Sequence, residues 1–188
     1  PMLKEFAVLA GLLAGTVSSA DTPWVTAKDY ARFHIVLADT ATEAELWGAE
    51  EFQTHWEKVT GYAIQTSNRP GRGINVWIGR DSVPEELLAE ADLAGLGSDG
   101  IYLRTFDAGP NGQPALVLSG GRERGAAYAV VEFLERALGV RWLTPTVTHI
   151  PEAPKSIAHV DHRYTPQLLR RKMSYTETNG WSAQVNAG

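Results

Sequence analysis

The segment GGRERG at residues 120–125 joins a short apolar run to a helical pattern, a position at which proteins often bind phosphate groups. Its glycines lack the G-x-G-x-x-G spacing of a dinucleotide-binding loop, and no Gly-Lys-Ser/Thr sequence completes a P-loop. The glycines therefore indicate a tight turn and close packing of the next helix. Arg122 and Arg124 are candidates for binding an anionic sugar or a neighbouring domain, because a helix N-terminus adds partial positive charge. The alternative for both residues is an ordinary solvated arginine.

His159, Asp161 and His162 are potential metal ligands that lie close together in the sequence. We expect their segment to be extended, and side chains three residues apart on a strand point to opposite faces. No recognisable ligand spacing accompanies them. The chain also has no cysteine, which excludes disulfides, thiolate zinc sites and cysteine nucleophiles. We therefore expect no metal and no cofactor.

Glycoside hydrolysis generally uses two carboxyl groups, about 5 Å or 6.5–9.5 Å apart. The chain has 22 Asp and Glu residues, but most of them fall on helix faces or in first helical turns. Asp81, Asp99 and Asp107 fall in loops, where Asp commonly forms turns. Ser82 and Ser119 lack the elbow motif of a nucleophilic serine. We therefore expect no catalytic residue in this chain.

The chain has six tryptophans, whose flat faces suit the stacking of sugar rings. Four of them fall in expected helices or strands, where packing in a core or an interface is the commoner use: Trp47, Trp56, Trp77 and Trp142. Trp24 and Trp181 lie in the flanks. With Arg122 and Arg124, Trp142 completes the set of candidate substrate-binding residues.

The strongest structural pattern runs from Ala115 to Pro145 and predicts a strand, a glycine loop, a helix and a second strand. The helix begins at Gly125 and presents apolar residues every three or four positions. Gly139 follows its last residues, where a left-handed cap favours glycine. We expect Val140–Leu143 to be a strand that returns to the same sheet.

Before this pattern, Phe33–Ala38 reads as a strand that is covered on both faces. A helix follows, and either Thr42 with Glu45 or Thr40 with Glu43 fits the capping box at its start. Its end is expected at Gly61. The predicted buried stripe comprises Leu46, Ala49, Phe52, Trp56 and Val59, with His55 and Lys58 pointing elsewhere.

The remaining pattern predicts strands at 62–66 and 74–79, a helix at 84–93, and strands at 101–106 and 115–119 joined as a hairpin. The order β-α-β-β-α-β-β-α-β indicates an α+β fold, with one mixed sheet covered by about three helices. After Pro145, recurring prolines suggest an extended connector, with one further edge strand within 157–164.

Residues 1–20 have the features of a signal peptide: a basic start, an apolar run and small residues before position 21. We therefore expect an exported protein, periplasmic or secreted, with Asp21 as the mature N-terminus and without a membrane span after cleavage. The formal net charge of −5 disfavours a nucleic-acid partner.

The motif Gly-x-x-x-Gly-x-x-Tyr-Ala-Val-x-x-Phe-Leu-Glu at residues 121–135 continues into Leu-Gly-Val-Arg-Trp-Leu-Thr-Pro at 138–145. It resembles the N-terminal α+β domain of bacterial glycoside hydrolases related to the family 67 α-glucuronidases. The second domain of the β-N-acetylhexosaminidases is a more distant relative. The resemblance implies that an accessory domain precedes a (β/α)8 barrel, and that the barrel holds the catalytic carboxylates.

On this reading the chain divides into a signal peptide at 1–20, an accessory domain at 21–151, and a connector with the possible start of an absent barrel at 152–188. The expected function is a non-catalytic accessory domain of an exported carbohydrate-active enzyme acting on uronic-acid- or hexosamine-containing glycans. Its expected partners are its own catalytic barrel and carbohydrate. A free-standing periplasmic carbohydrate-binding module is the alternative, and an independent small hydrolase is a third. We expect Gln167–Gly188 to be poorly ordered or loosely packed in isolation, because its barrel neighbours would be missing.

Overall fold

The structure is a computed structural model that describes residues 22–89, 91, 93–122 and 124–167. The expected signal peptide and the segment from 168 to 188 lie outside the described residues.

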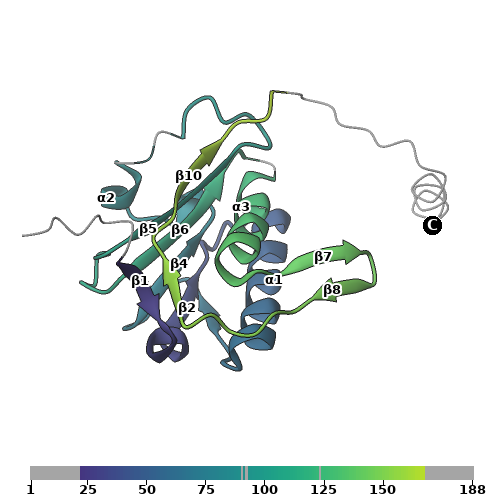
Figure 1. Ribbon diagram of the computed structural model, residues 1–188. Coiled ribbons are helices and arrows are strands. Elements are labelled where there is room, and N and C mark those ends of the chain that lie inside the picture. The colour runs from purple at the N-terminus through teal and green to yellow at the C-terminus, as the bar shows by residue number, and fades with distance from the viewer. Residues whose placement is uncertain (1–21, 90, 92, 123, 168–188) are drawn as a thin grey trace, which may run out of the picture.

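One mixed sheet of six strands forms the centre of the molecule, in the order β10-β5-β6-β4-β2-β3 (Figure 1). Strands β2, β3, β4 and β6 run parallel to one another, whereas β5 is antiparallel to β6 and β10 is antiparallel to β5. The α+β fold with a mixed sheet is therefore confirmed. The bounds of the six strands are β2 Phe33–Val36, β3 Gln65–Ser67, β4 Ile74–Ile78, β5 Ile101–Phe106, β6 Ala115–Gly120 and β10 Asp161–Tyr164.

Helices cover both faces of this sheet. On one face, α1 (Glu43–Thr60) packs beside α3 (Gly125–Phe133), which continues into the π-helical turn η3 (Leu134–Leu138). On the other face lies the short α2 (Glu85–Leu88), the first turn of the helix expected at 84–93. Burial on both faces explains why all five residues of β4 are buried, as a nearly continuous apolar strand requires.

The alternation of side chains in β4 assigns them to two separate cores. Ile74, Val76 and Ile78 pack in the larger cluster with α1 and α3, where Phe52, Trp56 and Phe133 are fully buried. Trp77 packs in the smaller cluster on the α2 face. Because strand side chains alternate between faces, one strand supplies residues to both layers.

The first residues of α1 form the capping box from Thr42 and Glu45. The Glu45 N–H donates to Thr42 Oγ1 at 3.3 Å, and the Thr42 N–H donates to Glu45 Oε2 at 2.8 Å. Of the two starts that the sequence allowed, the structure therefore has the later one. The helix ends at Gly61, which has φ 78° in the left-handed region, as expected.

Two small sheets flank the main one. Strand β1 (Pro23–Thr26), followed by the 3-10 helix η1 (Ala27–Arg32), pairs with β9 (Ser156–Ala158). Strand β7 (Arg141–Thr144) pairs with β8 (Val147–His149) in a hairpin that projects beside the helices (Figure 1). The edge strand expected within 157–164 is present as β10, which pairs with β5.

The prediction that Val140–Leu143 returns to the main sheet is wrong. After Gly139 caps the helix with φ 79°, the chain stays in the helical layer. There the Trp142 ring meets the ring of His55 in α1, with centroids 5.0 Å apart. This contact holds β7 beside the helices, and β10 occupies the edge of the sheet next to β5.

Two residues of α1 also differ from the predicted stripe. Leu46, which was predicted to belong to the buried stripe, is 48% exposed. His55, expected to point elsewhere, is 5% exposed because β7 covers it.

The described helices include none with the length and apolar character that a membrane span requires.

Candidate functional site

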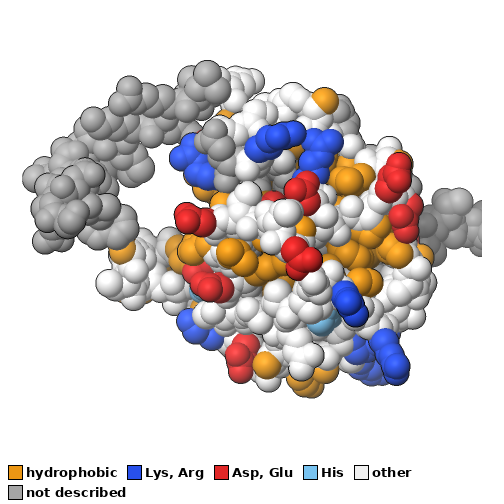
Figure 2. Space-filling view, turned by 180° about the vertical axis from the view of Figure 1, so that it is seen from behind, with side chains coloured by type: hydrophobic (Ala, Val, Ile, Leu, Met, Phe, Trp, Pro, Cys, Tyr) orange, Lys and Arg blue, Asp and Glu red, His pale blue; other side chains and the backbone are white. Residues whose placement is uncertain are grey.

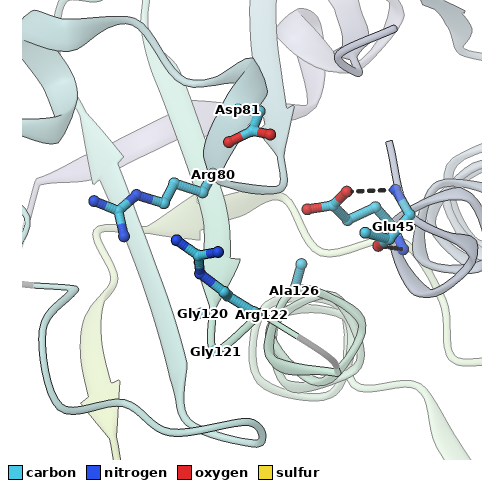
Figure 3. A pocket seen from close by; sticks show the side chains of 8 residues that line it. Glu45, Arg80, Asp81, Gly120, Gly121, Arg122 and Ala126 are labelled. Carbon is cyan, nitrogen blue, oxygen red and sulfur yellow. Dashed lines mark hydrogen bonds between the residues drawn. The ribbon is translucent and has the colours of Figure 1, made fainter. Parts of the chain in front are cut away.

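A cleft of about 470 Å³ lies beside the carboxyl ends of the parallel strands (Figure 3). From β2 the chain passes through α1 to β3, which lies next to β2 on one side of the sheet. From β4 the chain continues to β5 and β6, which lie on the other side of the sheet. In open α/β sheets, ligands commonly bind where neighbouring strands connect in opposite directions. The residues lining the cleft are Thr42, Glu45, Arg80, Asp81, Gly120, Gly121, Arg122 and Ala126.

Two arginines enter this cleft from paired strands. Arg80 begins the short 3-10 helix η2 (Arg80–Ser82) just after β4, and Arg122 follows β6. In the part of the chain that the structure describes, neither side chain makes a hydrogen bond or an ion pair. In Figure 3 both guanidinium groups lie on the opposite side of the pocket from Glu45.

The two carboxylates of the cleft have different surroundings. Glu45 accepts a hydrogen bond from the Thr42 N–H at 2.8 Å and is thereby held as part of the helix cap. Asp81 is exposed and accepts a long hydrogen bond of 3.4 Å from the Thr40 hydroxyl. Glu45 thus has a structural task, whereas Asp81 can accept hydrogen bonds from a ligand.

Gly79 lets the chain turn from β4 into the cleft. Its φ of 85° and ψ of 156° belong to a region that is essentially restricted to glycine. A Cβ atom at this position would also collide with the Glu45 carboxylate. The backbone at Gly79 therefore fits only a residue without a side chain, and Arg80 is placed by it.

The glycine loop before α3 is closely packed, as the sequence indicated. The Gly121 N–H donates to the Gly100 carbonyl at 2.8 Å, and the Gly125 N–H donates to the Gly121 carbonyl at 3.1 Å. A Cβ atom on Gly125 would collide with the Gly100 carbonyl oxygen and lie 2.7 Å from the carbonyl carbon of Gly120. These contacts hold Arg122 at the cleft.

The first turns of α1 and α3 border the same cleft but are capped differently. The N-terminus of α1 has its own capping box, whereas no side chain of the described residues caps α3. Ala126, in the first turn of α3, lines the cleft. The partial positive charge of this helix end therefore adds to that of the neighbouring Arg122.

Of the three residues that the sequence suggested for substrate binding, only Arg122 lines the cleft. Arg124 donates from Nε and Nη2 to both carboxylate oxygens of Asp99, at 2.9 and 3.2 Å. Trp142 packs on His55 and the main core. The three side chains are therefore not brought together at one site.

The group His159, Asp161 and His162 is divided among separate partners. His159 Nε2 lies 3.3 Å from Asp107 Oδ1, and His162 Nε2 lies 3.8 Å from Glu132 Oε1. Asp161 pairs with Arg104 at 3.5 Å. Among the described residues, no three His, Asp or Glu side chains are grouped as metal ligands.

The tryptophans mostly serve packing. Trp24, Trp56 and Trp77 are buried, and Trp47 on α1 is 46% exposed. The expectation of core packing is confirmed for Trp56 and Trp77.

No sequence pattern singled out Arg80, and Glu45 and Asp81 were expected only as a helix-capping residue and a turn residue. A usable signal existed, because Arg80 and Arg122 each follow an apolar run that ends in glycine. Carboxyl ends of parallel strands meet at one edge of a sheet, so two such runs would bring both arginines together if the two strands were parallel neighbours.

No family model matches this chain, and no curated protein sequence matches it. Among solved structures, the chain is similar to a family GH115 4-O-methyl-α-glucuronidase with specificity for decorated arabinogalactans. The sequence identity is 15% and the TM-score 0.48. The match covers 70% of this chain but only 17% of that enzyme, so the chain spans a small part of its length.

Proposed function

We propose that the chain is a non-catalytic, glycan-directed accessory domain of an exported carbohydrate-active enzyme. The observation that supports this best is the division of roles in the cleft. Arg80 and Arg122 line it without partners among the described residues, whereas Glu45 is engaged in capping α1. Glycosidases generally use two carboxyl groups that act on the bond together. The cleft is thus better suited to holding a ligand than to cleaving one.

The motif that resembles the glycoside hydrolase domains supports the same proposal. Its residues form one continuous unit that runs from the loop after β6 through α3 and η3 to β7. Its glycines make the close contacts between the loop and the helix, and its Tyr128 is 40% exposed. The proposed parent enzyme acts on glycans that contain uronic acids or hexosamines.

The proposed partner is a catalytic barrel of the same enzyme. Large apolar side chains are exposed on several elements, and Figure 2 shows a band of hydrophobic side chains across one face. Leu143 and Val147 on the projecting β7–β8 hairpin are 65% and 50% exposed. Exposed apolar surface of this kind commonly marks an interface.

A free-standing carbohydrate-binding module is a second candidate. It is favoured by the cleft, whose volume of about 470 Å³ lies in the usual range of ligand sites.

The test uses the whole chain in two assays: binding to an array of acidic and neutral glycans, and hydrolysis of aryl glucuronides and aryl N-acetylglucosaminides. We expect binding to at least one glycan and no hydrolysis above the background of the heat-denatured chain. Hydrolysis that is lost in Glu45→Gln or Asp81→Asn would show a catalytic domain and overturn the proposal. Absence of binding to every glycan would overturn its glycan-directed part.

A further inference from the structure

We infer that the cleft binds the carboxylate of an acidic sugar between the side chains of Arg80 and Arg122, with Asp81 accepting hydrogen bonds from the sugar hydroxyls. This inference rests on the proposed function and adds the class of ligand and the residues that select it.

The inference depends first on whether the guanidinium groups of Arg80 and Arg122 are available to a ligand. Elsewhere in the molecule, arginines near a carboxylate pair with it: Arg32 with Asp29, Arg104 with Asp161, Arg124 with Asp99 and Arg136 with Glu132. Arg80 and Arg122 share a cleft with Asp81 and Glu45, yet no ion pair joins them within the described residues. Their positive charges are therefore available to a ligand.

The chemistry of the guanidinium group points to an oxyanion. Its planar fork of N–H donors matches a carboxylate in a two-point arrangement. The first turn of α3, which no described side chain caps, adds partial positive charge next to Arg122. An anionic group in this half of the cleft would meet three sources of positive potential.

The other half of the cleft limits the charge of the ligand. Asp81 and Glu45 place two carboxylates in the same lining, and the whole chain has a formal net charge of −5. A polyphosphate or a nucleic acid would be repelled by these groups. A ligand with one carboxylate and several neutral hydroxyls avoids the repulsion, and its hydroxyls can donate to Asp81. An acidic monosaccharide unit has this combination of groups.

Isothermal titration calorimetry of the whole chain can test the inference with four probes: methyl glucuronoside, methyl glucoside, acetate and sulfate. We expect the glucuronoside to bind at least about 10-fold more tightly than the other three. The glucoside has no carboxylate for the two arginines, and acetate and sulfate have no hydroxyls that could donate to Asp81. Arg80→Gln and Arg122→Gln should each weaken glucuronoside binding by about 10-fold or more. Arg124→Gln is the matched control and should leave the affinity unchanged, because Arg124 pairs with Asp99 away from the cleft lining.

Equal affinity for the glucoside, or unchanged affinity in both cleft variants, would overturn the inference. Sulfate or acetate binding as tightly as the glucuronoside would also overturn it, since the site would then recognise any small oxyanion. Binding of the double variant Arg80→Gln/Arg122→Gln to the glycan array separates the two proposals. If array binding persists, the proposed function stands and this inference fails, whereas a chain that binds no glycan in either form contradicts both.

Discussion

Arg80 and Arg122 reach one cleft from two strands that are hydrogen-bonded to each other. Ile78, near the end of β4, lies beside Leu118 of β6 in the parallel register, and each arginine follows its strand after a glycine turn. The relative position of the two cations is therefore set by the backbone of the sheet. A site built in this way is largely formed before a ligand arrives.

Gly125→Val should lower the free energy of unfolding by about 2–4 kcal/mol, because its side chain would collide with the backbone of Gly100 and Gly120. Urea denaturation measures the change. Tyr128→Val introduces the same residue at an exposed position of α3 and should change stability by about 0.5 kcal/mol or less. Equal effects at both positions would show that the close approach at Gly125 contributes little.

Thr42→Ala should cost about 1 kcal/mol of stability, because it removes the hydroxyl that accepts the Glu45 N–H at the start of α1. Thr40→Ala is the control, since Thr40 makes only a 3.4 Å hydrogen bond with Asp81. Thermal melts of both variants distinguish the two possible capping boxes. A larger loss for the Thr40 variant would contradict the later start of the helix.

Trp142→Ala should destabilise the chain by about 1–3 kcal/mol, because the ring packs against His55 and the main core. The same variant should leave glucuronoside affinity unchanged, since Trp142 does not line the cleft. Calorimetry at a temperature where the variant is folded checks the second half. Lost affinity without lost stability would show a sugar-stacking role.

Asp29 should contribute to the acid sensitivity of the fold. The Thr26 N–H, which donates to Asp29 Oδ2 at 3.0 Å, holds the pKa of this carboxyl below its ordinary value of 3.8, and the Thr26 hydroxyl and Arg32 act in the same direction. A lowered pKa in the folded state stabilises the fold above the unfolded pKa, and this contribution is lost as the pH falls through the folded pKa.

Asp29→Asn should therefore lower stability at pH 7 by about 1 kcal/mol and reduce the loss of stability between pH 5 and pH 2. Urea denaturation across this pH range measures both effects. Glu152→Gln, at an exposed position, is the control and should leave the pH profile unchanged. If the Asp29 variant and the native chain lose the same amount of stability between pH 5 and pH 2, Asp29 does not contribute to the acid sensitivity of the fold.

The features that local sequence could predict are those that neighbouring residues determine. The capping box, the glycine stop at Gly61, the two-sided burial of β2 and the tight turn before α3 all follow from short segments. Each depends on backbone conformation or on the period of apolar residues within one element.

The features that local sequence could not predict depend on the order of the strands. Arg80 and Arg122 are far apart in the chain and meet only because β4 lies beside β6. The burial of His55 depends on a hairpin that comes much later in the chain and carries Trp142 against α1. The strand at Arg141–Thr144 has the composition of a sheet strand, and its place among the helices follows from that tertiary contact.

The central claim is that Arg80 and Arg122 together hold the carboxylate of an acidic sugar. Its most direct test is the NMR spectrum of the arginine Nε–H groups during titration with methyl glucuronoside, with signals assigned from Arg80→Gln and Arg122→Gln. We predict that the Arg80 and Arg122 signals shift together along one saturating curve, while the Arg124 signal stays in place and methyl glucoside has no effect. Saturable binding of the glucuronoside that leaves both cleft signals unmoved would contradict the claim.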